Sequence, residues 1–384
     1  MKKYKIFISI CVLVVLVIPL CHINPDKTSK QENRDLAVFP SISKEGKLNY
    51  DYGKEFEAWL GDRFWGREAL IGAGFQTIYK INGKIENKQA LMSPDGMIFD
   101  KDRIKSICTP INKEEFNKIK SSLKSLKTWC NSHNIKLYIF ISPDKEDVFL
   151  DQFADLLQKC ERDSVSNFIS RIKRELDIDI LYNKDIYKEN HKEFTFAHTD
   201  HHWTEYGALL TYQELSKRIK KDFPDFTILS KSDFNVFYNT YPRSGNFDNL
   251  FERPFYNGSN CATLGLFNKN CPLTHRYAYY DHKKLKHLNV EHGPIGWSRL
   301  TNFLDSENNL NVTLLGESHG GFLMSFLPYS VRNVFMIRTN NFENNVENIY
   351  DMKRFEKLIL DFKTDILLIY FSSSTLKHFS NFYD

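Results

Sequence analysis

The sequence predicts an α/β protein with a mainly parallel sheet that helices cover on both faces, preceded by an apolar N-terminal segment. Short apolar runs typical of buried strands lie at residues 135–142, 178–182, 311–316, 333–338 and 365–372. Amphipathic patterns predict helices at residues 113–132, 163–177, 204–221 and 344–362, and a further helix starts at 320–327. Strands that alternate with helices in this way form parallel sheets buried on both faces.

The chain begins with "MKKYK", and residues 6–23 then carry no charged side chain. This length is at the short end of what spans a bilayer. A secretory signal has the same pattern, but no small-x-small cleavage site follows the run. We therefore expect an uncleaved single-pass anchor in residues 1–23, with the rest of the chain outside the cytoplasm because the lysines precede it. Cleavage would instead give a secreted protein.

Residues 24–35 are polar and read as a linker, and residues 36–384 form the expected folded domain. Its first part shows helical spacing of apolar residues from Tyr52 onward. Residues 228–300 are rich in Tyr, Phe, Asn and Gly and lack the strand–helix rhythm. We expect an irregular insertion or lid there, whose aromatic residues either form a binding surface or belong to the core.

Composition excludes several classes of protein. With 31 Phe and 19 Tyr in 384 residues, most of the chain can pack a core. A net charge of +4 does not call for nucleic acid as a partner. The seven cysteines contain no C-x-x-C pair, which argues against a zinc ribbon. Cys261 and Cys271 could close a short disulfide loop, or the thiols could be buried and unpaired.

A candidate nucleophile stands in "LLGESHGGF", residues 314–322. An apolar strand runs into Gly316, Ser318 follows, and two glycines lead into a helical pattern. A serine on such a turn is held at the C-terminal edge of a parallel sheet, where backbone N–H groups can stabilise an oxyanion. Ser318 could equally be a helix N-cap.

A candidate base and its partner stand in "HTDHHW", residues 198–203. If the segment is extended, Asp200 and His202 share one face, His198 joins them, and His201 points the other way. His202 would then be a general base oriented by Asp200. Two alternatives remain: an H-x-D-x-H metal site, or a polar loop without chemistry. We expect Trp203 to be a packing residue that anchors the following helix.

These motifs resemble those of a known family. "TDHHWT" before a Gly-Ala helix resembles the signature of the DHHW family and is similar to the D-x-H-W motif of the alginate O-acetyltransferases. The resemblance extends in the same order to four further segments, namely "ENRDLAVFP" (32–40), "FEAWLGDRFWGREALI" (56–71), "YIFISPDKEDVF" (138–149) and "LLGESH" (314–319). It ends at the last strand, "FKTDILLIYF", and so spans roughly residues 32–384.

The resemblance implies an SGNH-hydrolase-like three-layer sandwich and assigns roles to residues. Ser318 would be the nucleophile, His202 the base and Asp200 its orienting partner. The backbone N–H of Ser318 would contribute to an oxyanion hole. "SGNFDNLF" (244–251) lies where the family often has a Gly-Asp-Leu element, so Gly245 or Asn246 could donate as well, although a plain turn is the simpler interpretation.

The resemblance also implies an activity: transfer of an acetyl group through acetyl-serine to hydroxyls of a cell-surface or extracellular polysaccharide. The chemistry requires no cofactor, and a membrane-bound O-acyltransferase would supply the acetyl groups. Glu317 and His319 depart from the family pattern and leave the substrate and the donor open. A secreted carbohydrate esterase and a non-catalytic glycan-binding protein are the alternative functions.

Overall fold

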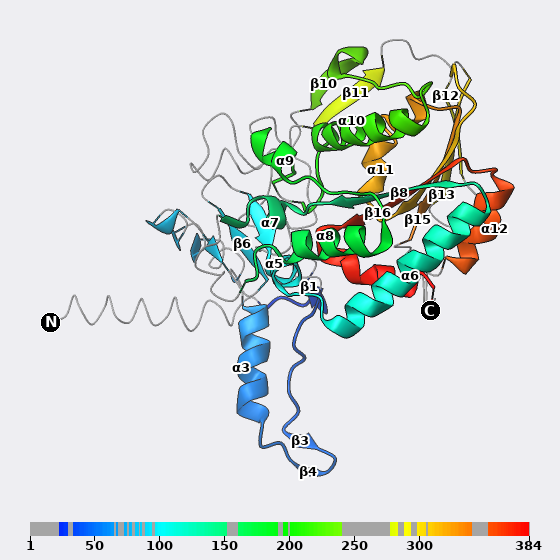
Figure 1. Cartoon of the computed structure of the whole chain (residues 1–384). Coiled ribbons are helices and arrows are strands. Elements are labelled where there is room, and N and C mark those ends of the chain that lie inside the picture. Colours follow the sequence, from blue (N-terminus) through cyan, green and yellow to red (C-terminus); the bar gives the residue numbers. More distant parts are fainter. Residues whose placement is uncertain are drawn as a thin grey trace. The chain divides into compact units, whose positions relative to one another are not determined.

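A computed structural model describes the chain in several stretches (Figure 1). These stretches are residues 23–29, 34–64, 67, 73–74, 77–78, 81–83, 85–86, 89–93, 97–151, 160–190, 195–198, 200–239, 277–282, 288–292, 298–304, 306–339 and 352–383. The expected anchor at 6–23 therefore lies outside the described residues, apart from Ile23. Within those stretches, no helix combines the length and apolarity needed to cross a bilayer.

The chain divides into two compact units, which are described separately. The first contains residues 1–98 and 242–273, and the second contains residues 99–241 and 274–384. The expected domain of residues 36–384 thus includes parts of both units. In the first unit, the helix expected from Tyr52 is α3 (Tyr52–Arg63). The aromatic rings of Phe56 and Trp59 on this helix pack edge-on against Phe39, with centroids 6.1 and 4.8 Å away.

Short strands complete the first unit. They are β1 (Thr28–Ser29), β2 (Arg34–Asp35), β3 (Ser43–Lys44), β4 (Lys47–Leu48), β5 (Ile85–Glu86) and β6 (Ala90–Met92). The pairs β1–β2 and β3–β4 are antiparallel, and β5 and β6 form a three-stranded sheet with β7 (Ile98–Asp100). The chain passes into the second unit within β7.

A seven-stranded sheet forms the centre of the second unit, in the order β12-β13-β15-β14-β16-β8-β9. Its strands are β8 (Lys136–Ser142), β9 (Ile180–Leu181), β12 (Leu288–His292), β13 (Ser298–Phe303), β14 (Asn311–Gly316), β15 (Asn333–Arg338) and β16 (Ile366–Ser372). The five strands from β15 to β9 are parallel to one another. Strand β13 pairs antiparallel with both of its neighbours, β15 and β12. A mainly parallel sheet is thus confirmed.

Helices lie on both faces of this sheet, with α10 and α11 on one face and α6 and α8 on the other (Figure 1). Its α-helices are α5 (Lys101–Cys108), α6 (Lys113–Ser132), α7 (Lys145–Val148), α8 (Ser164–Leu176), α9 (Asp185–Glu189), α10 (Glu205–Asp222), α11 (Gly320–Leu323) and α12 (Lys353–Asp361). In the described part of the chain, the 3-10 helices are η4 (Lys231–Asp233), η7 (Leu327–Tyr329) and η8 (Ser373–Asn381). Part of the helix expected at 344–362 falls outside the described residues, and α12 is its visible end.

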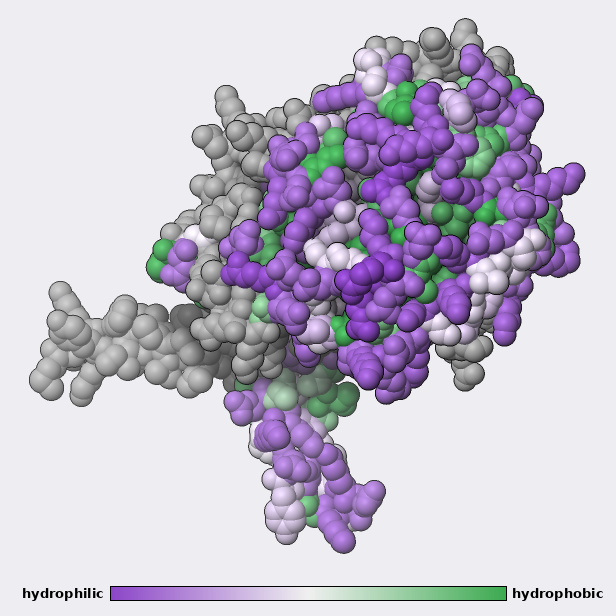
Figure 2. Space-filling view, viewed as in Figure 1, coloured by the Kyte–Doolittle hydropathy of each residue, from purple (hydrophilic) through white to green (hydrophobic). Residues whose placement is uncertain are grey.

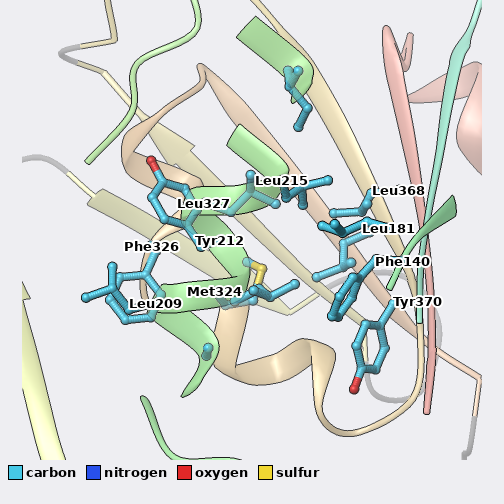
Figure 3. Packing of buried hydrophobic residues seen from close by; sticks show 14 of the residues in the cluster. Phe140, Leu181, Leu209, Tyr212, Leu215, Met324, Phe326, Leu327, Leu368 and Tyr370 are labelled. Carbon is cyan, nitrogen blue, oxygen red and sulfur yellow. The ribbon is translucent and has the colours of Figure 1, made fainter. Parts of the chain in front are cut away.

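The core follows from side-chain alternation along the buried strands. Phe140, Leu368 and Tyr370 face α10 and pack among its apolar side chains, including Leu209 and Leu215 (Figure 3). On the opposite face, the ring of Phe371 packs against Phe379 in η8, with centroids 4.5 Å apart. The visible outer surface of this unit is mostly hydrophilic (Figure 2), as expected for helices that bury only one side.

Where the structure describes the expected irregular insertion at 228–300, much of the chain is in regular strands. β10 (Phe234–Asn239) pairs antiparallel with β11 (Tyr277–His282), and β12 and β13 extend the main sheet. These strands have five or six residues each and mix polar with apolar residues. Antiparallel neighbours need no crossover helix, so no strand–helix rhythm marks them. Residues 240–276 lie outside the described part.

One disulfide links Cys108, the last residue of α5, to Cys160, which precedes α8. The sequence analysis did not select this pair, because 52 residues separate the two cysteines and their spacing matches no motif. Cys130 is a free, buried thiol. The suggested Cys261–Cys271 pair lies outside the described residues.

Candidate active site

The turn after β14 presents Ser318 at the C-terminal edge of the sheet. Gly316 pairs with Arg338 of β15 and with Tyr370 of β16. A Cβ atom on Gly316 would lie 2.2 Å from the carbonyl oxygen of Tyr370, so this position requires glycine. The chain then turns sharply into α11, and the Gly321 N–H donates to the Ser318 carbonyl at 3.0 Å. The expected strand–turn–helix setting of Ser318 is confirmed, although α11 has only four residues.

The loop before α10 carries the other candidate residues. Phe196 and Trp203 form an antiparallel bridge, and the Ala197 N–H donates to the His202 carbonyl at 3.1 Å. The Thr204 side chain caps α10 by accepting from the Gly207 N–H at 3.3 Å. These short-range bonds bring Phe196 and Ala197 together with His202 and Trp203 in a compact turn. The segment is therefore not extended, and the assumption of alternating side chains is wrong.

Ser318, His202 and Asp200 are nevertheless brought together in one hydrogen-bonded chain. His202 Nε2 lies 2.8 Å from Ser318 Oγ, and His202 Nδ1 lies 2.6 Å from Asp200 Oδ1. The same carboxylate oxygen accepts the His202 backbone N–H at 3.1 Å. With Nδ1–H donating to Asp200, Nε2 is the acceptor for the serine hydroxyl. The arrangement can remove the Ser318 proton and return it.

The expectation that His201 points away from this group is wrong. Its ring lies 3.9 Å from that of His202, and the His319 ring lies 4.4 Å from His202, between centroids. One nitrogen from each of His201, His202 and His319 lies within 4.8 Å of the others, and a metal ion could use these three. The expected alternative of His198, Asp200 and His202 is thus not the set that the compact turn assembles. His198 is buried, and its carbonyl accepts from Lys145 Nζ at 3.1 Å.

The electrostatics favour a carboxylate beside neutral imidazoles. Burial opposes ionisation of Asp200, but hydrogen bonds from His202 and the nearby imidazoles outweigh it and lower the pKa of Asp200. Burial, together with the positive charge of Arg103, lowers the pKa of His201 to about 2. Burial also lowers the pKa of His319 well below its ordinary range. Asp200 is therefore an acceptor at neutral pH, and His201 and His319 add no charge.

Trp203 connects the two halves of the site. It is 1% exposed, its ring stacks on Phe140, and its Nε1–H donates to the His319 carbonyl at 3.2 Å. The expectation that Trp203 is a packing residue is confirmed. The hydrogen bond adds a function that packing alone did not suggest, because it links the loop that carries His202 to the turn that carries Ser318.

A cluster of buried polar and charged residues lies behind the site and was not predicted from the sequence. Asp144 and Lys145 follow directly after β8, and Arg103 forms an ion pair with Asp144. The Asp144 carboxylate also accepts the Ser374 N–H at 2.7 Å. Glu317, which departs from the family pattern, is buried, and its carboxylate lies 3.3 Å from His378 Nδ1. The polar "PDKED" directly after the largely buried strand β8 was the signal that could have found part of this cluster.

Part of the predicted oxyanion hole cannot be placed. Gly245 and Asn246 lie outside the described residues. The contribution of the Ser318 backbone N–H stays a prediction, as do the catalytic roles of Ser318, His202 and Asp200.

Fold and site together define the class of protein. A mainly parallel sheet with a serine after a central strand, and an Asp-x-His pair on a neighbouring loop, is an SGNH-hydrolase-like α/β arrangement. Comparison with known proteins agrees: residues 102–263 match the family model described as "SGNH hydrolase-like domain, acetyltransferase AlgX". The match includes Asp200 and His202 and ends before Ser318. The resemblance to the DHHW and alginate O-acetyltransferase-like proteins is confirmed.

Solved structures share the fold at low sequence identity. Bacillus cereus PatB1 with a sulfonyl adduct has a TM-score of 0.55 and 12% identity, over 77% of this chain and 100% of that one. A DHHW family protein from Eubacterium siraeum has a TM-score of 0.53 and 11% identity, over 78% and 98% of the two chains. No curated protein sequence matches the chain.

Proposed function

We propose that this protein is an O-acetyltransferase that moves an acetyl group through acetyl-Ser318 onto a hydroxyl of a cell-surface or extracellular polysaccharide. The observation that carries the proposal is the hydrogen-bonded chain from Asp200 through His202 to Ser318, with distances of 2.6 and 2.8 Å. The match to an AlgX-type acetyltransferase model supports acetyl as the transferred group. The resemblance to alginate O-acetyltransferases supports a polysaccharide as the acceptor.

The reaction is a double displacement. His202 Nε2 accepts the Ser318 hydroxyl proton as Oγ attacks the acetyl carbonyl carbon of the donor. The tetrahedral intermediate collapses, its bond to the donor oxygen breaks, and that oxygen takes the proton from His202. An acceptor hydroxyl then loses its proton to His202 and attacks acetyl-Ser318. The bond between Oγ and the acetyl carbon breaks, and Ser318 regains its proton.

Asp200 fixes the tautomer of His202 and stabilises the imidazolium that forms in each step. The developing oxyanion would be met by the Ser318 backbone N–H, with Gly245 or Asn246 as the second donor. Transfer instead of hydrolysis requires that the acceptor hydroxyl displace water from the acyl-enzyme. Phe322, whose ring centroid lies 5.6 Å from that of His202, is an apolar wall beside the base.

The proposal includes a location and a donor. Residues 6–23 would anchor the protein as a single-pass membrane protein, with the catalytic part outside the cytoplasm. A membrane-bound O-acyltransferase would supply the acetyl groups at the same surface. The support for both is the apolar N-terminal sequence and the family resemblance.

Replacement of Ser318 by Ala tests the proposal. With p-nitrophenyl acetate as donor and a panel of neutral, amino and uronic oligosaccharides as acceptors, kcat should fall at least about 10⁴-fold. Intact-protein mass spectrometry should detect one acetyl group on the wild type and none on Ser318→Ala. Ser325→Ala, which changes a half-buried serine seven positions further along the chain, is the matched control and should leave kcat unchanged.

Three results would overturn the proposal. If oligosaccharides gain no acetyl while acetylated glycans are hydrolysed, the protein is a carbohydrate esterase that uses the same serine. If Ser318→Ala turns over acetyl esters as fast as the wild type, Ser318 is not the nucleophile. If the wild type binds glycans but turns over neither acetyl esters nor acetylated glycans, the protein is a glycan-binding protein.

A further inference from the structure

A buried lysine lies behind the loop that carries Asp200 and His202. Lys145 is the first residue of α7, three residues after the end of β8, and it is 0% exposed. Lysine is almost never fully buried unless its charge is compensated. Its environment therefore calls for a specific reason.

The Lys145 ammonium group donates to three backbone carbonyls of one loop. Nζ lies 3.0 Å from the Ala197 oxygen, 3.1 Å from the His198 oxygen and 2.6 Å from the Asp200 oxygen. Three acceptors equal the number of N–H donors of an ammonium group. The ammonium also lies 5.6 Å from the centroid of the Phe99 ring. Three peptide carbonyls thus contact the ammonium group directly, and the buried Glu146 carboxylate attracts its charge.

These three carbonyls belong to the turn that orients the proposed base. Backbone bonds hold the ends of the turn, where Thr204 N–H donates to Thr195 at 3.0 Å and Ala197 N–H donates to His202 at 3.1 Å. Lys145 holds the part between them. Asp200 is consequently fixed twice, by Lys145 at its carbonyl and by His202 at its carboxylate.

We propose that Lys145 is a positioning residue for acyl transfer, which acts through Asp200 and His202 by fixing the peptide planes of their loop. The inference rests on the proposed function. Lys145 does not touch Ser318 or the reacting atoms in this mechanism. Loss of its hydrogen bonds lets the Asp200 carboxylate and the imidazole leave the geometry that Ser318 needs, and displacements of about 1 Å can cost about 100-fold in rate.

A double-mutant cycle tests this role. Lys145→Met keeps an unbranched side chain of nearly the same length and removes the donors, and Asp200→Asn removes the negative charge of the carboxylate. We expect Lys145→Met to lower kcat for p-nitrophenyl acetate about 100-fold with little change in KM, and Asp200→Asn to lower it about 10⁴-fold. The double variant should lose no more than about as much as Asp200→Asn alone, since both changes disable the same unit.

Losses that multiply in the double variant, or an unchanged kcat in Lys145→Met, would overturn the proposal. Lys136→Met, which changes an exposed lysine at the other end of β8, is the control and should keep its kcat within about twofold. If Lys145→Met does not fold, Lys145→Gln retains two N–H donors and takes its place in the cycle, with a smaller expected loss.

A second measurement separates this proposal from the proposed function. In Lys145→Met, amide hydrogen exchange at residues 197–202 should accelerate at least about tenfold, while that of α6 stays the same. This result stands even if Ser318→Ala shows that the protein is not a serine acyltransferase. Unchanged exchange in the loop would show that Lys145 does not hold it.

Discussion

Acid should destabilise this protein because neutral imidazoles are buried beside the proposed nucleophile. His319 is 2% exposed, and burial lowers its pKa well below the ordinary range. In the unfolded chain this imidazole takes up a proton below about pH 6.5. The folded protein binds fewer protons there, so the free energy of unfolding falls as the pH falls through that value.

His319→Gln isolates this effect. A glutamine keeps an N–H donor for the His201 carbonyl, to which His319 Nε2 lies at 3.2 Å. One imidazole that stays neutral in the folded state lowers the free energy of unfolding by about 2 kcal/mol between about pH 7.5 and about pH 5. The variant should be less stable than the wild type at the higher pH, because it loses the ring contact with His202, but its loss on acidification should be smaller by about 2 kcal/mol.

Glu146 works in the opposite direction. Burial raises its pKa to about 7, against the attraction of Lys145. The folded protein then binds more protons than the unfolded chain, so this contribution is present at low pH and is lost as the pH rises through about 7. Both proteins contain Glu146, and its contribution cancels in the difference between them.

Urea unfolding followed by tryptophan fluorescence at several pH values measures the difference. His133→Gln, which replaces an exposed histidine at the end of α6, is the matched control, and its pH curve should run parallel to that of the wild type. If His319→Gln also runs parallel to the wild type, the folded protein protonates His319 and the reasoning from burial is refuted.

Two further changes test the scaffold by thermal and urea unfolding. Gly316→Ala should cost about 1–3 kcal/mol, because its Cβ would meet the Tyr370 carbonyl at 2.2 Å. Gly321→Ala, whose Cβ meets nothing within 4 Å, should stay within about 0.5 kcal/mol; equal effects would contradict the packing argument. Replacing Cys108 and Cys160 by Ser should cost about 4 kcal/mol in the loop-entropy model for a separation of 52 residues. A loss well below 1 kcal/mol would show that the bond constrains little. Burial raises the pKa of Cys130 to about 12, so alkylation of this thiol in the folded protein should be slow and should speed up on unfolding, as mass spectrometry can show.

The parallel core could be predicted from the sequence because its central strands β14 and β16 are buried on both faces. A strand such as β16, in which all seven residues are buried, stands out as an apolar run. The sequence pattern of helix α6 is equally clear, because its apolar residues lie on one side and Asn112 forms a capping box. Its bounds are those predicted. Strands β12 and β13 are antiparallel and mix polar with apolar residues, so no such run exists to find.

Some residues of the candidate site could likewise be predicted from the sequence, and others could not. The turn at Gly316 is local, since the strand ends where glycine is required, and Ser318 could therefore be identified. The orientation of His201 depends on bonds that close the loop around Phe196 and Trp203. The alternation of side chains expected for an extended strand does not apply to such a loop. The role of Lys145 depends on carbonyls more than fifty positions away. Sequence spacing carries no information about that contact.

The hydrogen bond from Trp203 to the His319 carbonyl has a consequence for how such a protein can diverge. It joins the base-bearing loop and the serine-bearing turn directly, although 116 residues separate its two partners in sequence. The alignment of the two segments is thus set locally and does not depend on the chain that connects them. Insertions, deletions and new surface loops between Asp222 and Asn311 can therefore accumulate outside the core residues and the strands β12 and β13, while the distance between His202 and Ser318 is preserved.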